Sequence, residues 1–304
     1  MRILITGSKG QLGNELTRCI RDMAAEIGPI PAAYAGAIVD AVDYDALDIS
    51  DRNAVNAWFS VHDYDPVINC AAITNVDGCE ADEDAAFKVN ALGPENLALA
   101  CAAQGAKLVH VSTDYVFTGD MPGDRVETDP TEPISAYGRT KLTGEEKALA
   151  TNPSTFVCRT AWLYGYMGKN FVKTMRRLGE THGEITVVDD QLGNPTSAND
   201  LAYEVLRIAL TDDYGVYHVT GKGTCSWAQF AQAIMDGSDL ACHVVPVTSD
   251  QYKAANPGSA DRPHFSSLCN LHLKETIGDE MRPWEIALAE YLRRLPETEG
   301  HVNV

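Results

Sequence analysis

The sequence predicts an α/β protein built on a Rossmann-type, doubly wound parallel sheet with a smaller C-terminal substrate-binding lobe. Three observations support this fold class. A short buried strand runs directly into a glycine-rich turn and a helix, strand and helix patterns alternate through the first half, and the pattern becomes turn-rich after residue 160. Such alternation implies a parallel sheet with right-handed crossovers. We therefore expect a dinucleotide-binding domain over residues 1–160 and mainly a substrate-binding lobe over residues 161–304, with elements around 196–222 returning to the first domain.

The hydrophobic pattern places the individual elements. Apolar runs bounded by turn residues predict strands at 2–6, 37–42, 67–71, 107–112 and 155–159. Helical periodicity between them predicts helices near 11–25, 52–61, 84–103 and 136–149. In the second half, helices are expected near 169–180, 198–210, 227–236 and 284–295, followed by a frayed tail over 297–304.

A glycine-rich turn joins the first strand to the first helix. Gly7, Gly10 and Gly13 form a Gly-x-x-Gly-x-x-Gly pattern there. Glycine permits a tight turn and lets a pyrophosphate approach the backbone, and the helix N-terminus adds unpaired N–H groups and a positive dipole end. The pattern therefore predicts a dinucleotide site formed by Gly7, Gly10, Gln11, Leu12 and Gly13.

An acidic residue at the end of the second strand bears on the choice of coenzyme. Asp43 is placed to hydrogen-bond the adenosine ribose, which would favour NADH over NADPH. Its separation from Gly13 is longer than usual, so we assume an insertion around residues 28–36. Asp40 and Asp45 compete for the same role.

Two further segments are expected at the dinucleotide site. Asp48 and Ile49 could meet the adenine, although Asp48 could equally be a loop residue that precedes a helix. Ala71 and Ala72 follow the third strand, at the sheet edge where the glycine turn also lies. Because ligands of open parallel sheets bind beyond the carboxyl ends of the strands, these residues should line one crevice.

A Tyr-x-x-x-Lys step is the most informative pointer to chemistry. Tyr137 and Lys141 lie four residues apart in a predicted helix and therefore share one face. An ammonium group beside a phenol stabilises the phenolate, so we expect the pKa of Tyr137 to fall toward neutral pH. Such a phenol can exchange a proton with an alcohol or a carbonyl. Thr113, at the end of the fourth strand, could bond to the same oxygen.

Composition and charge exclude several classes of partner. A net charge of −19 argues against binding to nucleic acid or to an anionic membrane surface. No apolar stretch approaches ~18 residues, and the apolar run at the N-terminus breaks at Gly7, so neither a membrane span nor a secretory signal is predicted. Eight scattered cysteines without a Cys-x-x-Cys pair are typical of reduced cytoplasmic thiols and predict no zinc site. His110, inside a strand, is interpreted as a core residue rather than a ligand.

Seven ordered blocks carry a resemblance to a known family. They are residues 69–77, 112–117, 137–142, 159–164, 170–175 and 190–196, and Arg262-Pro263 followed by Ser266. With the glycine turn, they resemble the extended short-chain dehydrogenase/reductases over nearly the whole chain, and among these the reductases of nucleotide-linked 4-keto-deoxysugars. The resemblance implies NADPH or NADH as cofactor and a nucleotide sugar as the small-molecule partner.

The resemblance also implies roles for individual residues. Tyr137 would donate a proton to the sugar C4 ketone as hydride arrives from the nicotinamide. Lys141 would lower the pKa of the tyrosine and hold the nicotinamide ribose, and Thr113 would hydrogen-bond the reacting oxygen. Substrate contacts are implied for Thr74, Val116, Phe117, Trp162, Asn170, Lys173 and Arg262. Trp162 could instead be a core residue, and Lys173 could lie on a solvated helix face.

Two other functions share this fold. Sugar dehydratases and epimerases belong to the same superfamily, and dehydratases typically follow the threonine with an Asp-Glu pair that serves as acid and base. Here Asp114 is followed by Tyr115, which favours simple reduction. The third hypothesis is a non-catalytic dinucleotide-binding regulatory subunit, such as the one associated with methionine adenosyltransferase. All three catalytic side chains are intact in this chain, which argues against that role.

The sequence also bears on a metal ion. Some members of the resembled family hold magnesium at a subunit contact through glutamates. Glu15 matches one of them, but residues 196–200 provide no second glutamate. We therefore predict no such metal and leave a homodimer open.

Overall fold

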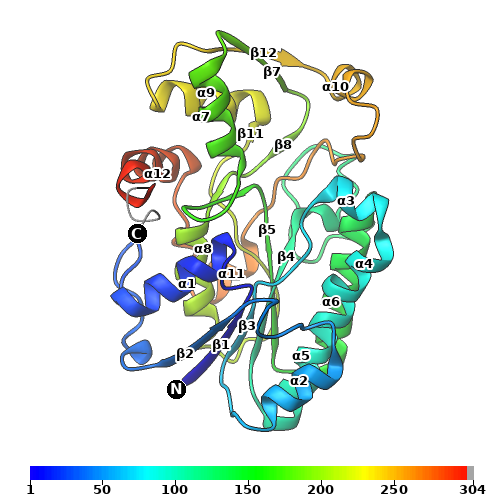
Figure 1. The fold of residues 1–304 in the computed structure, drawn as a ribbon, viewed down its shortest axis with the longest axis vertical. Coiled ribbons are helices and arrows are strands. Elements are labelled where there is room, and N and C mark those ends of the chain that lie inside the picture. The colour runs from blue at the N-terminus through cyan, green and yellow to red at the C-terminus, as the bar shows by residue number, and fades with distance from the viewer. Residues whose placement is uncertain (300–304) are drawn as a thin grey trace.

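The computed structural model describes residues 1–299 and contains one central sheet of six parallel strands (Figure 1). The strand order is β10-β5-β4-β3-β1-β2, and every neighbouring pair is parallel. Helices cover both faces of the sheet, so the predicted doubly wound α/β fold is confirmed. The strands span Arg2–Thr6 (β1), Ile38–Val42 (β2), Val67–Asn69 (β3), Leu108–Thr113 (β4), Thr155–Thr160 (β5) and Gly215–His218 (β10).

Successive side chains of β1 pack on opposite faces of the sheet, as the period of a strand requires. Ile3 and Ile5 join an apolar cluster with helices α1 and α8, whereas Leu4 joins the cluster formed with α2, α5 and α6. Because both faces are buried, the central strands are apolar along most of their length. The helices span Gln11–Asp22 (α1), Arg52–Phe59 (α2), Gly93–Gln104 (α5), Ala136–Thr151 (α6) and Ala198–Ile208 (α8).

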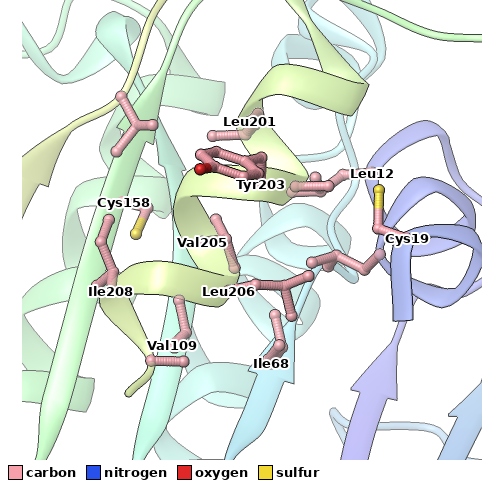
Figure 2. Packing of buried hydrophobic residues seen from close by; sticks show 14 of the residues in the cluster. Leu12, Cys19, Ile68, Val109, Cys158, Leu201, Tyr203, Val205, Leu206 and Ile208 are labelled. Carbon is pink, nitrogen blue, oxygen red and sulfur yellow. The ribbon is translucent and has the colours of Figure 1, made fainter. Parts of the chain in front are cut away.

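Helix α8 and strand β10 come from the second half of the chain and complete the central layer. Strand β10 pairs with β5 at the edge of the sheet. Figure 2 shows Leu201, Val205 and Leu206 of α8 packed over the strands that carry Ile68 and Val109. The five strands expected in the first half are present within two residues of the expected bounds, and β10 adds a sixth.

The insertion assumed between the first helix and the second strand folds against α8. It contains a short 3-10 turn, η1, over Ala32–Tyr34. Tyr34 is 1 % exposed, and its hydroxyl donates to the Leu206 carbonyl at 2.7 Å. The insertion is therefore anchored to the core, and it lengthens the path from the glycine turn to Asp43.

The single helix expected near 84–103 is interrupted. The chain forms α3 over Val76–Ala81, α4 over Glu83–Phe87 and a π turn, η2, over Lys88–Leu92 before α5 begins. The π turn carries Asn90, which is fully buried and bonds the Ile73 N–H and carbonyl at 2.8 and 3.0 Å. A regular helical period does not reveal such a turn, because its cause is a contact with a distant loop.

A separate apolar core lies in the second lobe, at the top of Figure 1. Its two-stranded parallel sheet consists of β7 (Glu184–Val188) and β12 (His243–Val247), flanked by α7 (Phe171–Thr181) and α9 (Trp227–Gly237). The remaining elements are η3 (Asp114–Val116), β6 (Leu163–Tyr164), β8 (Leu192–Gly193), β9 (Thr196–Ser197), β11 (Cys225–Ser226), α10 (Ser249–Ala255), α11 (Leu271–Thr276) and α12 (Trp284–Glu299).

Helix α12 is longer than expected. It runs to Glu299, so the expected tail is wrong for residues 297–299, and residues 300–304 lie outside the described residues. Trp284, Leu288 and Tyr291 anchor this helix in the core of the second lobe. Across residues 1–299, no helix is both long and apolar enough to cross a bilayer.

Candidate active site

The turn after β1 requires glycine at two positions. Gly7 has φ +65°, and a Cβ built on it would lie 2.7 Å from the Ala71 nitrogen. A Cβ on Gly13 would lie 2.4 Å from the Gly7 carbonyl oxygen. Both neighbours are backbone and cannot move aside. Helix α1 begins after Gly10, which provides no side-chain cap, so its first N–H groups are available to an anionic ligand.

A cavity of about 700 Å³, here called the outer cavity, lies beside the glycine turn. Asp43 lines it, and its Oδ2 accepts the Lys9 N–H at 3.0 Å. The two competing acids are occupied elsewhere: Asp40 bonds Arg2 at 2.7 Å, and Asp45 bonds the Lys9 ammonium at 2.9 Å. The expected residues that line the outer cavity are Gly7, Gly10, Asp43, Asp48, Ile49, Ala71 and Ala72.

A second cavity of about 540 Å³, the inner cavity, continues from the outer one along the glycine turn. The two share Gly7, Gly10, Cys70 and Ala72. The inner cavity contains the expected turn residues Gln11, Leu12 and Gly13, and it also brings together Thr113, Tyr137 and Lys141. The glycine turn and the Tyr-x-x-x-Lys step, which are far apart in sequence, therefore meet in one place.

The Thr113 hydroxyl has two hydrogen-bond partners in the site. It donates to Asp114 Oδ1 at 2.9 Å and accepts the Tyr115 N–H at 3.2 Å, and it lines the inner cavity beside Tyr137. A hydroxyl has one proton, and here that proton goes to Asp114. A bond from Thr113 to a ketone oxygen would therefore require release of its bond to Asp114.

The expectation that Lys141 lowers the pKa of Tyr137 is wrong for this structure. Burial raises the pKa of the Tyr137 phenol. Helix α6 does place both residues on one side, but Lys141 Nζ donates to the Val111 carbonyl at 2.6 Å, along β4 rather than toward the phenol. The raised pKa keeps the phenolic proton in place at neutral pH, which is the state that a proton donor needs.

Lys141 itself is strongly perturbed. It is 2 % exposed, and burial lowers the pKa of its amine to about 8, against an opposing effect of Glu145. Nζ lies 3.4 Å from Nε2 of His110, a fully buried residue on β4. The amine therefore loses its proton more readily than an exposed lysine does.

Asp114 is the only carboxylate among the described residues that line the inner cavity. It is 1 % exposed, and burial raises the pKa of its carboxyl group to about 6. Its Oδ1 accepts from Thr113, and its Oδ2 is buried. Sequence reasoning used Asp114 only as an argument against elimination, whereas the structure places it in the wall of the inner cavity.

The residues assigned to substrate are only partly brought together. Thr74, Trp162 and Asn170 line the inner cavity. Asn170 caps α7 and donates to Gln11 Oε1 at 3.1 Å, which ties the second lobe to the glycine turn. Lys169 beside it also lines the cavity and was missed, although Gly168 and Lys169 directly before a helix N-terminus were a usable signal.

Three of the expected substrate residues lie elsewhere. Val116 and Phe117 are 0 % and 1 % exposed and line none of the cavities described here. Phe117 packs instead under the Arg159 guanidinium, 5.2 Å from its ring centre. Lys173 turns back to the Tyr166 carbonyl, to which Nζ donates at 2.5 Å. Apolar and cationic residues that adjoin a motif in sequence can therefore stabilise the fold without contacting the substrate.

An aromatic wall closes the inner cavity on the side of the second lobe. The rings of Trp162 and Trp227 stack at 3.5 Å and 7°, and Phe171 lies 4.5 Å from Trp227. Trp162 has φ +45°, a left-handed conformation that is costly for a bulky residue. Trp227 and Phe171 each begin a helix and belong to no catalytic motif, so their place in the wall was not predicted.

The aromatic wall separates the inner cavity from a third one of about 440 Å³, here called the lobe cavity. Phe171 and Trp227 line both. Arg262 lines the lobe cavity rather than the inner one, and it is held by Asp77 of α3 at 3.1 Å. Lys253 and His264 add further basic side chains to this cavity.

Glu15 is buried at the junction of α1 and α8. Its Oε2 accepts from Arg18 at 2.5 Å and from Asn199 at 2.8 Å. Asp200, the following residue, is paired with Arg282 at 2.5 Å. Within residues 1–299, no group of three or more His, Cys, Asp or Glu could hold a metal ion. That no metal binds near Glu15 stays a prediction.

The fold and site together define a dinucleotide-binding protein of the extended short-chain dehydrogenase/reductase type. A family model described as "RmlD substrate binding domain" matches residues 1–296. A dTDP-4-dehydrorhamnose reductase of Mycobacterium tuberculosis is 41% identical over 98% of this chain and 97% of its own. The chain belongs to the family of the RmlD substrate binding domain.

Two solved structures extend the comparison. The crystal structure of a dTDP-4-dehydrorhamnose reductase from Clostridium acetobutylicum is 44% identical, with a TM-score of 0.89 over 97% of this chain and 100% of that one. That of dTDP-4-dehydrorhamnose reductase from Bacillus anthracis, solved in complex with NADP, is 37% identical, with a TM-score of 0.87 over 96% of this chain and 99% of that one.

Proposed function

We propose that this protein reduces the C4 ketone of dTDP-4-dehydro-L-rhamnose to dTDP-L-rhamnose with NADPH or NADH, in the supply of nucleotide sugar for cell-surface polysaccharide. The observation that carries the proposal is the inner cavity, where Thr113, Tyr137 and Lys141 meet the glycine turn. The near full-length similarity to dTDP-4-dehydrorhamnose reductases supports the choice of substrate.

The residues present fit a nicotinamide dinucleotide. The uncapped start of α1 and the close glycine turn suit a pyrophosphate. The outer cavity suits the adenosine half, with Asp43 at the ribose. Tyr137 and Lys141 would hold the nicotinamide half in the inner cavity. The coenzyme supplies the hydride, and the relative from B. anthracis was solved with NADP.

The protein supplies the proton. Reduction adds hydride to C4 and a proton to its oxygen, so the site needs one acid. The Tyr137 phenol is that acid, because burial keeps it protonated and it lies with Thr113 and Lys141 in the inner cavity. Burial lowers the pKa of the Lys141 amine to about 8, and this amine would have to turn from the Val111 carbonyl to return a proton to the phenolate after each turnover.

The substrate is larger than the inner cavity alone. We place the sugar ring in the inner cavity against Trp162 and the nucleotide diphosphate toward the lobe cavity, across the aromatic wall. Lys253 and Arg262 give the lobe cavity cationic donors for phosphate oxygens, although the whole chain carries a net charge of −19. In this structure they pair with Asp261 and Asp77, which a bound diphosphate would have to displace.

The competing functions are less well supported. Elimination would use a second carboxylate, and among the described lining residues Asp114 is the only one. A regulatory subunit would not need a polar catalytic set, whereas Thr113, Tyr137 and Lys141 are all present and in contact with one cavity. We place the reaction in the cytoplasm, because the eight cysteines are free thiols, as in a reducing compartment.

The test is coenzyme oxidation with a panel of nucleotide-linked 4-keto sugars. We expect dTDP-4-dehydro-L-rhamnose to be consumed with NADPH or NADH and to yield dTDP-L-rhamnose. The same sugar linked to UDP, and the C5 epimer linked to dTDP, serve as matched alternatives. If another keto sugar is reduced faster, that sugar replaces dTDP-4-dehydro-L-rhamnose as the assigned substrate. If no keto sugar is reduced, the proposed activity is refuted.

A further inference from the structure

A buried histidine lies directly behind the active-site lysine. His110 is 0 % exposed and lines none of the three cavities. Its Nε2 lies 3.4 Å from Lys141 Nζ, and its Nδ1 lies 3.1 Å from the side-chain nitrogen of Asn69 on β3. The reduction described above assigns no role to this imidazole.

Asn69 fixes which ring nitrogen of His110 carries the proton. The Asn69 Oδ1 accepts the Ala71 backbone N–H at 3.1 Å and the Thr6 hydroxyl at 2.6 Å. A backbone N–H can only donate, so the carbonyl oxygen of Asn69 must face Ala71, and its NH₂ group faces His110 Nδ1. His110 Nδ1 therefore accepts, and the neutral ring carries its proton on Nε2.

That proton points at the lysine amine. An ammonium group has no lone pair, so a protonated Lys141 would face an N–H with another N–H. A neutral amine accepts from Nε2 and still donates to the Val111 carbonyl at 2.6 Å. The hydrogen bonds around Lys141 are thus complete only when the amine is neutral.

Glu145 is the charged neighbour that opposes this preference, because its carboxylate favours the ammonium form. Glu145, one helical turn along α6, is paired with Arg159 of β5 at 2.7 Å. Burial raises the pKa of the Cys70 and Cys158 thiols, so both are neutral at physiological pH. Among the described residues, Lys141 forms no ion pair.

We infer that His110, oriented by Asn69, is a positioning residue that disfavours the ammonium form of Lys141. The use of the Lys141 proton in turnover rests on the proposed function, whereas the effect on Lys141 itself does not. The hydrogen bonds run in series from Asn69 through His110 to the Lys141 amine, which lies in the same site as the Tyr137 phenol.

The test measures the protonation of Lys141 without sugar or coenzyme. Cyanate carbamylates neutral amines, and mass spectrometry of the peptide that contains Lys141 follows its labelling as a function of pH. In H110Q, the glutamine carbonyl can accept from the ammonium, so the pH of half-maximal labelling should rise by about one unit. In N69D, the new carboxylate accepts a proton from Nδ1 of His110, so the ring carries its proton on Nδ1 and Nε2 becomes an acceptor. The pH of half-maximal labelling of Lys141 should therefore rise in this variant too.

His218 provides a matched control. It is also a fully buried histidine on a sheet strand, with Nδ1 at 3.0 Å from the Arg125 carbonyl, and it has no contact with Lys141. H218Q should leave the labelling of Lys141 unchanged. Melting temperatures of all variants report any general loss of stability.

Two outcomes overturn the inference. If H110Q and N69D are folded and their Lys141 is labelled at the same pH as in the unsubstituted protein, His110 is only a core residue. An equal shift in H218Q would attribute the effect to loosened packing. A shift of about one unit in either of the first two variants, with no turnover of any keto sugar, would sustain the inference while refuting the proposed function.

Discussion

The two ends of the active site are formed by different parts of the chain, backbone at one end and side chains at the other. At the coenzyme end, the backbone of the glycine turn makes the site, and a Cβ on Gly7 or Gly13 would collide with rigid backbone. At the lobe end, side chains from separate segments make it, among them Trp162, Trp227 and Arg262. Backbone geometry demands particular residue types at fixed spacing, whereas a wall of side chains demands only that packing bring them together.

The difference has a consequence for specificity. The coenzyme end reads features that every dinucleotide shares, namely a pyrophosphate and a ribose. The lobe end meets the variable part of the substrate, through a stacked indole pair and several basic groups. Substitutions at the two ends should therefore separate coenzyme affinity from sugar affinity, and the reacting phenol between them should affect neither.

The largest effect is expected from Tyr137→Phe, at the junction of the two ends. The change removes the proton donor and keeps the ring that packs 5.6 Å from Tyr115. Turnover should fall by about 10²–10⁴-fold, with unchanged dissociation constants for coenzyme and sugar nucleotide. Steady-state kinetics and coenzyme fluorescence titration measure the two quantities. A variant with near-normal turnover would show that another group protonates the ketone.

The second effect belongs to the coenzyme end. Gly7→Ala forces a Cβ to 2.7 Å from the Ala71 nitrogen at φ +65°, so the turn must shift. We expect a loss of about 1–3 kcal/mol, seen as a lower melting temperature and as weaker NADPH binding. Gly28→Ala is the matched control, because a Cβ at Gly28 has no neighbour within 4 Å. Equal behaviour of the two variants would contradict a backbone-built site.

The same contrast explains what could be predicted from the sequence. The glycine turn and Tyr137 with Lys141 are local patterns, and the structure places each of them in the crevice. The second-lobe wall depends on helices α7 and α9 meeting in space, so Trp227 had no local signal. The direction of the Lys141 amine was mispredicted because helix spacing fixes the face of a residue but not the partner of a long side chain.

Errors of the opposite kind occur where a residue adjoins a motif. Val116 and Phe117 follow the Ser-Thr-Asp block, and sequence proximity alone placed them at the substrate. The structure buries both in an apolar cluster with Leu268 instead, and Phe117 also packs against the Arg159 guanidinium. Elements around 196–222 were expected to return to the first domain, but no strand or partner was assigned there. The partner of β10, strand β5, lies about sixty residues earlier, and such a pairing cannot be seen in a local window.

A moderate effect is expected from Trp227→Ala at the lobe end. It removes the partner stacked on Trp162 at 3.5 Å and opens the wall between the inner and lobe cavities. Loss of one aromatic contact is worth ~1.5 kcal/mol, so KM for the sugar nucleotide should rise roughly tenfold while coenzyme affinity stays the same. Trp58→Ala, on α2 outside the cavities, controls for loss of an indole. If coenzyme affinity alone changes, Trp227 belongs to the coenzyme end of the site and not to the lobe end.

The smallest effect concerns the choice between the two coenzymes. Asp43 lines the outer cavity with its carboxylate held by the Lys9 N–H, so it would favour the ribose hydroxyl of NADH and repel the extra phosphate of NADPH. Asp43→Ala should shift the ratio of kcat/KM toward NADPH by roughly fivefold, which corresponds to ~1 kcal/mol. Asp40→Ala is the control, because Asp40 pairs with Arg2 outside this cavity. If both variants keep the original selectivity, the ribose is recognised elsewhere, and Lys9, whose ammonium pairs with Asp45 at the cavity rim, becomes the next residue to replace.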